Sequence, residues 1–293
     1  MARLQANGIE IEYEVRGDPA GAALLMISGL GAQLTGWDDE FCKELTDRGF
    51  HLIRYDNRDA GLSTKMESAG PPNVMAVYNG EADPAYTLDV LADDAVGVLD
   101  ALVIPAAHLV GASMGGFIAQ LVAINHPSRV LSLTSIMSGP GGEDTVAPTP
   151  DAADVLTRAP GATREEAIAS AVAGRRVLVG TANPFDPDDE RRRASRAYDR
   201  SFYPVGLGRQ FAAILGARSR LTALAGVKVP TLVVHGIDDP LVPLENGRLV
   251  AAAVLGARLI ELEGMGHNIP RRYWPVIADA IAETSRQANA VAS

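Results

Sequence analysis

Residues 108–125 read HLVGASMGGFIAQLVAIN, and the turn at Gly111-Ala112-Ser113-Met114-Gly115 within them decides the fold. The short apolar run before this turn is typical of a buried strand, and the apolar stretch Phe117 to Ile124 after it is typical of a helix buried against a sheet. A serine between such elements adopts strained backbone geometry, which requires almost no side chain two residues before and two after it. Gly111 and Gly115 meet this requirement. The stretch therefore predicts a strand, a sharp turn and a helix, with the Ser113 hydroxyl exposed above the sheet.

The rest of the chain alternates apolar runs of strand length with helical stretches. The expected buried strands are Leu24 to Ser28, His51 to Asp56, His108 to Ala112, Leu131 to Ile136, Thr231 to Gly236 and Arg258 to Glu263. The expected helices are Trp37 to Arg48, Thr87 to Leu102, Met114 to Asn125, Leu244 to Leu255 and Pro275 to Gln287. Ahead of them, residues 9–15 alternate apolar and acidic side chains, which predicts an edge hairpin. This alternation predicts an α/β fold with a mostly parallel central sheet flanked by helices.

The alternation is interrupted between Gly139 and Val227. No convincing strand pattern occurs there, and three helical stretches are expected, at Arg164 to Val179, Asp188 to Phe202 and Leu207 to Leu224. We therefore expect a core formed by residues 1–138 and 228–293, with residues 139–227 inserted as a helical cap. The basic run at 191–193 follows three acidic residues and is interpreted as a solvated helix face.

Composition narrows the choice of partners. The chain has 293 residues with 26 Lys and Arg against 36 Asp and Glu, a formal net charge of −10, which opposes binding to nucleic acid or anionic lipid. No apolar run approaches the roughly 18 residues that a membrane span needs, and residues 1–15 do not resemble a secretory signal, so a cytoplasmic location is expected. The single cysteine, Cys42, is expected to be a small buried hydrophobe.

A serine nucleophile needs a base, and the chain has five histidines to supply one. His51 and His108 begin strands and so lie at the wrong end of a parallel sheet, while His126 is at the far end of the helix after Ser113. Two candidates remain. His235 ends a strand, and His267 lies in a glycine-rich loop after the last strand, from which a side chain can extend over the sheet.

An acid that orients the base is expected in the loop after the penultimate strand. Asp238 and Asp239 both lie there, and an aspartate before proline also suits a turn. The order Ser113, Asp239, His267 along the chain matches the nucleophile, acid, histidine order of one fold class.

Taken together, these motifs resemble those of the α/β-hydrolase fold superfamily, over almost the whole chain. Gly111 to Gly115 is similar to its nucleophile elbow, Gly236 to Pro243 to its G-x-x-D-x-x-x-P acid loop, and Gly264 to His267 to its G-x-G-H loop. The resemblance implies Ser113, Asp239 and His267 as the catalytic residues, with Asp239 preferred to Asp238.

Two further stretches refine the resemblance. Asp56 to Ser63 is similar to the superfamily's D-x-R-G-x-G-x-S motif, with Asp59 where glycine is usual. Ser28-Gly29-Leu30-Gly31 stands where the superfamily commonly has His-Gly-x, yet an oxyanion hole needs backbone N–H groups and not that histidine. The resemblance therefore implies Leu30 and Met114 as oxyanion donors. The sequence looks most like the branch of small actinobacterial esterases that includes aclacinomycin methylesterase.

The resemblance implies a serine esterase that cleaves a carboxylic ester of a small molecule without a metal or cofactor. The same triad also fits a lactonase, a thioesterase, a C–C bond hydrolase or a cofactor-free haloperoxidase, and a non-catalytic ligand receptor stays open as well. Dehalogenase and epoxide hydrolase relatives use an aspartate nucleophile, so Ser113 argues against those activities.

The cap contains no histidine, and we expect it to set substrate choice, with residues 207–216 as an apolar wall. The sequence leaves the oligomeric state undetermined, and a homodimer stays open.

Overall fold

A computed structural model describes residues 1–182 and 184–292, and its centre is one eight-stranded sheet in the order β1-β2-β4-β3-β5-β6-β7-β8. The strands are β1 (Ala2–Ala6), β2 (Ile9–Arg16), β3 (Ala22–Ile27), β4 (Phe50–Tyr55), β5 (Ala107–Ala112), β6 (Val130–Ile136), β7 (Thr231–Gly236) and β8 (Arg258–Leu262). β1 and β2 pair antiparallel through a turn in which Asn7 and Gly8 have φ of 47° and 77°, as expected for an edge hairpin. The strands from β3 to β8 pair in parallel, so the predicted α/β fold is confirmed.

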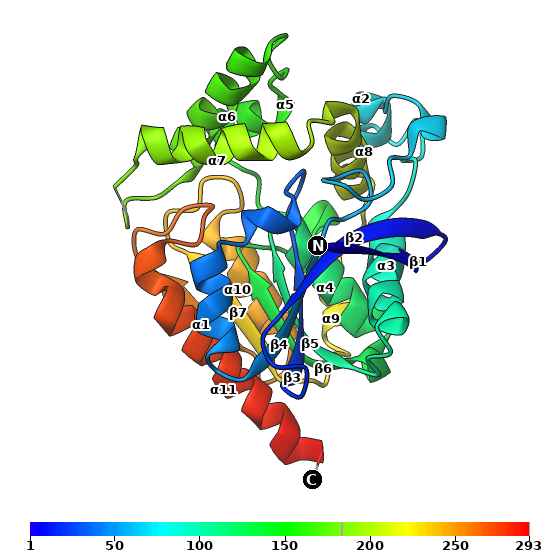
Figure 1. The fold of residues 1–293 in the computed structure, drawn as a ribbon, viewed down its shortest axis with the longest axis vertical. Coiled ribbons are helices and arrows are strands. Elements are labelled where there is room, and N and C mark those ends of the chain that lie inside the picture. The colour runs from blue at the N-terminus through cyan, green and yellow to red at the C-terminus, as the bar shows by residue number, and fades with distance from the viewer. Residues whose placement is uncertain (183, 293) are drawn as a thin grey trace.

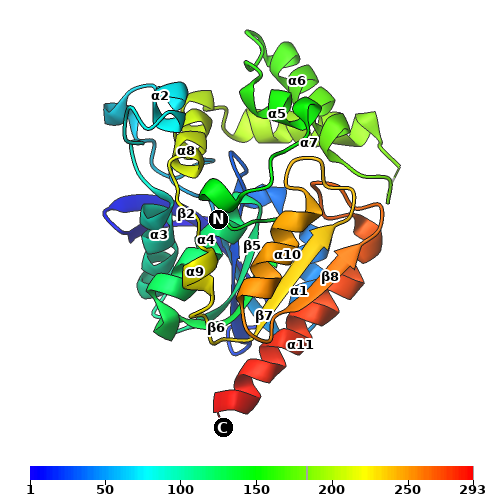
Figure 2. The ribbon, with the colours of Figure 1, turned by 180° about the vertical axis from the view of Figure 1, so that it is seen from behind.

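Helices cover both faces of the sheet, as Figures 1 and 2 show. They are α1 (Asp39–Thr46), α3 (Leu88–Ala101), α4 (Met114–Asn125), α10 (Leu244–Ala253) and α11 (Trp274–Ala292). The short helix α2 (Val74–Tyr78) lies instead beside α8 (Pro204–Leu215), over the end of the sheet. Alternate residues of the strands β3 to β8 enter different apolar cores, one on each face of the sheet. Leu25 packs with α3, α4 and α10, whereas Leu24 packs with α1 and α11, where Cys42 is buried. Both faces of the sheet are therefore apolar, which explains the continuous apolar runs in the sequence.

Among the described residues between β6 and β7, the α-helices are α5 (Pro150–Thr157), α6 (Arg164–Leu178), α7 (Pro187–Arg200), α8 (Pro204–Leu215) and α9 (Leu221–Leu224). Helices α5 to α8 form a layer over one end of the sheet, and α9 returns to the core beside α4 (Figures 1 and 2). The expectation of one helix from Leu207 to Leu224 is wrong, because the chain leaves the helix at Gly216 and forms α9 separately. Helix α5 was not expected at all.

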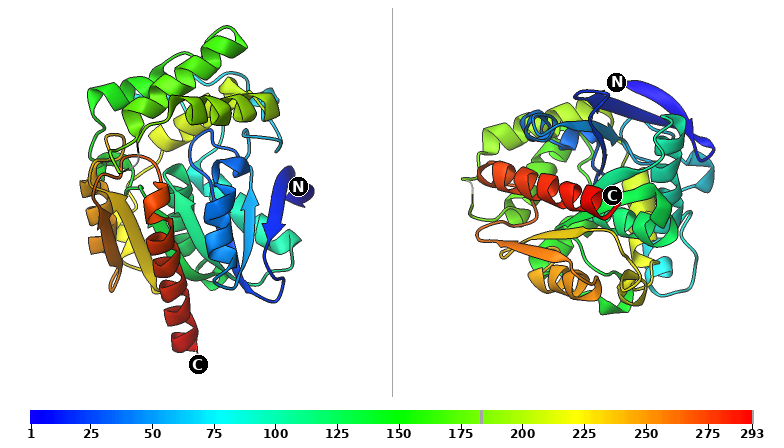
Figure 3. Two further views of the ribbon diagram at one scale, coloured as in Figure 1. Left: turned by 60° about the vertical axis from the view of Figure 1, so that its left-hand side comes forward. Right: turned by 90° about the horizontal axis from the view of Figure 1, so that it is seen from below.

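The C-terminal end lies away from this layer, whereas Met1 at the other end of the chain has its Sδ 3.8 Å from Nη2 of Arg200 in α7. Figure 3 shows the end of α11 projecting from the opposite side of the molecule and the β1–β2 hairpin at the edge of the sheet. Among the described helices, none combines the length and the apolar character that a membrane crossing requires.

Candidate active site

Ser113 occupies the sharp turn between β5 and α4, with φ 56° and ψ −124°. This conformation is costly for a residue with a side chain and persists only where the surroundings enforce it. The flanking glycines show how. A Cβ on Gly111 would lie 2.1 Å from the carbonyl oxygen of Gly115, and a Cβ on Gly115 would lie 2.0 Å from that of Ile27. The backbone segments therefore pass too closely for any side chain at these two positions.

The structure brings Ser113, His267 and Asp239 together at the carboxyl ends of the strands. His267 follows β8, and its Nε2 lies 3.0 Å from Ser113 Oγ. The other ring nitrogen, Nδ1, lies 2.8 Å from Asp239 Oδ2. Both distances suit hydrogen bonds, and a proton on Nδ1 would leave Nε2 free to accept the serine proton.

Asp239 is fixed by its own loop. Its Oδ1 accepts hydrogen bonds from the backbone N–H groups of Leu241 and Val242, both at 2.9 Å, which leaves Oδ2 facing His267. Asp238 is exposed, whereas Asp239 is buried, so their environments differ although the two are adjacent.

His235, the rival base, lies behind the acid loop. Its Nε2 donates to the carbonyl oxygen of Val242 at 2.7 Å and stands 3.8 Å from Asp239 Oδ2. Burial lowers the pKa of His235, which favours the neutral ring. This geometry suits support of the acid loop and provides no contact with Ser113.

Two of the remaining histidines have partners away from Ser113, and the third, His51, lies near the start of β4 with its buried Nδ1 unpaired within residues 1–182 and 184–292. His108, at the amino end of β5, lies between Ser132 and Ser285, with both ring nitrogens 2.8 Å from a hydroxyl oxygen. His126 pairs with Asp93 at the far end of α4.

The turn at residues 29–32, here called the oxyanion turn, lies against Ser113. A Cβ on Gly29 would be 3.2 Å from both Ala112 O and Ser113 Cβ. Within the described part of the chain, the backbone N–H groups of Leu30 and Met114 have no hydrogen-bond partner. Two unpaired N–H groups close to a serine suit the stabilisation of a negatively charged oxygen.

Asp59 shows why its motif position is usually glycine. Its φ is 66°, a backbone conformation that glycine adopts easily and residues with a side chain adopt at a cost. The hydrogen bonds of the Asp59 carboxylate oppose this cost. Arg209 of α8 donates to both carboxylate oxygens at 2.8 Å, and the Tyr86 hydroxyl donates at 2.7 Å. Burial alone would raise the pKa of Asp59, but these hydrogen bonds hold it below its usual value. The aspartate therefore ties the core to the inserted helices.

The inserted helices also contact the histidine loop, which the sequence analysis did not anticipate. The His267 N–H donates to the carbonyl oxygen of Leu178 at 2.7 Å, just where α6 ends. A Cβ on Gly180 would lie 2.1 Å from Gly264 O, and one on Gly266 would lie 2.4 Å from Gly180 N. In the sequence, the only indication of this close approach was Gly180, a glycine directly after a predicted helix.

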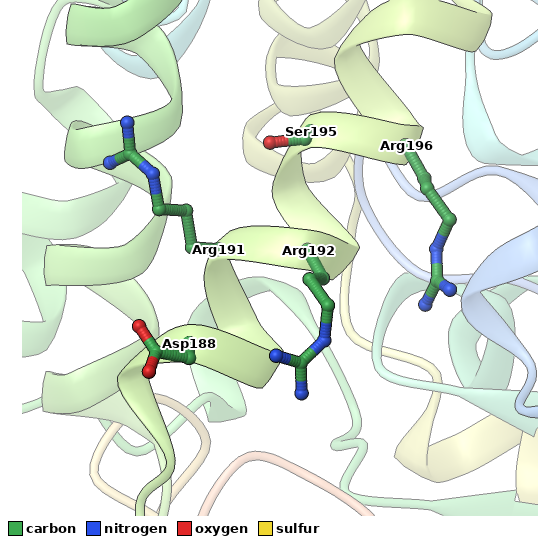
Figure 4. A pocket seen from close by; sticks show the side chains of 5 residues that line it. All are labelled: Asp188, Arg191, Arg192, Ser195 and Arg196. Atoms are coloured by element: carbon green, nitrogen blue, oxygen red, sulfur yellow. The ribbon is translucent and has the colours of Figure 1, made fainter.

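A separate surface hollow lies on α7, where Figure 4 shows its lining side chains along one face of the helix: Asp188, Arg191, Arg192, Ser195 and Arg196. None of the residues around Ser113 lines it. Arg193 differs from the expected solvated face, since it reaches the core and pairs with Asp38 at 2.8 Å.

Comparison with known proteins identifies the family to which the chain belongs. Residues 22–270 match the alpha/beta hydrolase fold family, and the chain belongs to it. Rhodomycin D methylesterase DnrP of Streptomyces peucetius is 34% identical over 93% of both chains. Rhodomycin D methylesterase DauP of Streptomyces sp. strain C5 is 33% identical over the same shares. Among solved structures, a meta-cleavage product hydrolase from Pseudomonas fluorescens superposes with a TM-score of 0.79 over 98% of both chains at 19% identity, a likeness of fold.

Proposed function

We propose that the protein is a serine esterase that hydrolyses a carboxylic ester of a small molecule through an acyl-enzyme on Ser113. The observation that carries the proposal is the chain of contacts from Asp239 through His267 to Ser113, at 2.8 and 3.0 Å, on a strained turn. The similarity to two methylesterases supports a carboxylic ester as the bond cleaved.

In the first half-reaction, His267 Nε2 accepts the proton of Ser113 Oγ as that oxygen attacks the ester carbonyl carbon. Asp239 keeps the other proton on Nδ1 and stabilises the imidazolium. The N–H groups of Leu30 and Met114 donate to the carbonyl oxygen as it becomes negative. When the tetrahedral intermediate collapses, the alkoxide leaves with the proton from His267 Nε2.

In the second half-reaction, water attacks the acyl-enzyme and transfers its proton to His267 Nε2. Collapse of the second intermediate returns this proton to Ser113 Oγ and releases the carboxylic acid. The residues needed are the same in both halves, because the base of one step is the acid of the next.

The two relatives are methylesterases, which favours a methyl ester as the substrate. Hydrolysis of such an ester would release a carboxylic acid and methanol, and either product can be measured. Residues 139–227 act in this proposal as a cap that selects the acid part of the ester. A cytoplasmic location stays a prediction from the sequence, and a homodimer stays open.

The test is covalent trapping. Intact-mass spectrometry after mixing with p-nitrophenyl butyrate is expected to detect an acyl adduct that maps to Ser113, along with steady release of p-nitrophenol. Ser113→Ala is expected to lose both signals. Steady turnover by Ser113→Ala, or an adduct on another residue, would contradict the proposal. A binding protein without catalysis would give neither signal in the wild type.

A further inference from the structure

Gln210 of α8 is a fully buried amide whose two ends contact two different core loops. Its Oε1 accepts the backbone N–H of Gly31 at 2.8 Å, and its Nε2 donates to the carbonyl oxygen of Arg58 at 2.7 Å. Both contacts are buried or partly buried, where a lost partner is costly. One side chain of the inserted helices therefore bridges the oxyanion turn and the loop after β4.

The Gly31 contact fixes a particular turn. The N–H of Ala32 donates to Gly29 O at 3.2 Å, and Gly31 has φ 65° whereas Leu30 has no positive φ. This combination defines a type II turn, in which the peptide between Leu30 and Gly31 is rotated relative to the commoner type I turn. Gln210 Oε1 accepts the N–H of that same peptide.

We propose that Gln210 is a positioning residue for the oxyanion hole, holding the turn in the form that directs the Leu30 N–H toward the oxygen formed at Ser113. The inference rests on the proposed esterase function. Gln210 itself makes no hydrogen bond to Ser113; it holds the peptide between Leu30 and Gly31, which adjoins the Gly29–Leu30 peptide that carries the Leu30 N–H. The inserted helices then contribute to the geometry of the reaction as well as to substrate choice.

A purely structural role as a fastener of α8 is the competing explanation, but α8 is held to the core independently. The neighbouring Arg209 binds Asp59 through two nitrogens and donates to the carbonyl oxygen of Gly70 at 2.7 Å. Leu207 packs on the same turn, since a Cβ on Gly31 would lie 2.7 Å from its Cδ1. Loss of the Gln210 amide should therefore leave α8 in place while releasing the peptide of Gly31.

The experiment compares Gln210→Met, which removes both polar contacts, with Gln210→Glu, which keeps an acceptor for the Gly31 N–H and loses the donor to Arg58. The kcat and KM for p-nitrophenyl butyrate are measured, together with inhibition by phenylboronic acid, which adds to a serine oxygen as a tetrahedral anion. Misplacing one donor should lower the kcat of Gln210→Met by roughly 10- to 100-fold, with KM changed less than about 3-fold. Inhibition should weaken by a similar factor, and Gln210→Glu should keep at least about a third of the wild-type kcat.

The matched control is Arg193→Gln, which breaks another contact between the inserted helices and the core, the ion pair with Asp38. It is expected to keep the wild-type kcat and boronate affinity. If Gln210→Met keeps its kcat, changes only KM and melting temperature, or behaves like Gln210→Glu, the inference is overturned. Should Gln210→Met not fold, Gln210→Ala tests the same contact. A wild type that hydrolyses no ester and takes no adduct on Ser113 would instead refute the proposed function.

Discussion

The nucleophile elbow and the oxyanion turn lie side by side over the same serine, yet they are held in different ways. The elbow is constrained by short-range sterics, because Gly111 and Gly115 let neighbouring backbone segments pass within contact distance. The oxyanion turn depends on Gln210, which lies 179 residues further along the chain than Gly31. In the proposed mechanism, a local motif therefore specifies the nucleophile, whereas the donor beside it depends on an inserted helix.

This comparison indicates which changes should abolish activity and which should only adjust it. In the proposed mechanism, the groups that exchange protons or form bonds with the substrate belong to the core loops. Groups of the inserted helices act through those loops or through the shape of the pocket. The predictions below test that division, beginning with the largest effect.

Ser113→Ala is expected to lower kcat by on the order of 10⁴- to 10⁶-fold, because the triad acts as a unit and no nucleophile replaces the hydroxyl. The fold should persist, since alanine is smaller and the strain at this turn is relieved or unchanged. Steady-state kinetics with p-nitrophenyl butyrate and a circular dichroism spectrum provide the measurement. Retention of more than roughly a tenth of the wild-type rate would remove Ser113 from the mechanism.

His267→Ala is expected to cost about as much as loss of the serine, because the same proton transfer is lost. His235→Ala is the matched control. It should lower the melting temperature through the lost hydrogen bond to Val242 and leave kcat within a few-fold of the wild type. An inactive His235→Ala beside an active His267→Ala would reverse the assignment of the base.

Asp239→Asn is expected to lower kcat by about 10³- to 10⁴-fold, since an amide in place of the carboxylate favours the wrong imidazole tautomer. Asp238→Asn, a change at the neighbouring exposed residue, should have little effect. The two variants are compared by kcat at one pH. Equal losses would leave the acid unassigned.

The sequence predicted the core more fully than the inserted helices, and particular residues show why. The elbow and the acid loop are recognisable because their constraints lie within a few residues. Helix α5 was missed although Thr149 and Pro150 form an ordinary helix start, since the surrounding residues are rich in proline, glycine and threonine. The helix predicted from Leu207 was too long because the apolar pattern continues past Gly216.

The bridge made by Gln210 had no sequence signal of its own. A glutamine inside a helix is unremarkable, and its two partners are backbone atoms, which leave no pattern in the side chains. Two contacts of the inserted segment with the histidine loop are made by backbone atoms, at Leu178 and Gly180, and in a third the Arg175 side chain donates to the carbonyl oxygen of His267 at 3.3 Å. Only a three-dimensional structure reveals such pairings.

Phe211 tests whether α8 also forms part of the pocket. It is half-buried and lies one helical turn after Leu207, which packs on the oxyanion turn. Phe211→Ala is expected to change the ratio of kcat/KM between long and short acyl esters by about 1 to 3 kcal/mol, while a small activated ester is still hydrolysed. Phenyl esters of increasing acyl length measure this ratio. An unchanged ratio with a lower melting temperature would mean that Phe211 only packs the helix.

The smallest expected effect concerns stability. It lies at the end of β5 opposite Ser113, where His108 is buried between Ser132 and Ser285. Burial lowers the pKa of His108 from 6.5 to about 4, so the folded protein binds this proton less readily than the unfolded chain does. The contribution of the neutral ring to stability is therefore complete above about pH 6.5 and is lost as the pH falls toward 4. Each such histidine adds at most about 1.4 kcal/mol per pH unit to the slope.

Urea unfolding between pH 7 and pH 5 measures this slope in the wild type and in His108→Asn. The variant should be less stable at pH 7 but should lose less stability on acidification, and His235, whose pKa is also lowered by burial, should account for part of the slope that remains. The kcat of His108→Asn at pH 7 should match the wild type, because the residue lies at the amino end of the strand that Ser113 follows. Equal slopes in the two proteins would show that His108 is protonated equally in the folded and unfolded states, and a large fall in kcat would connect this end of the sheet to the active site.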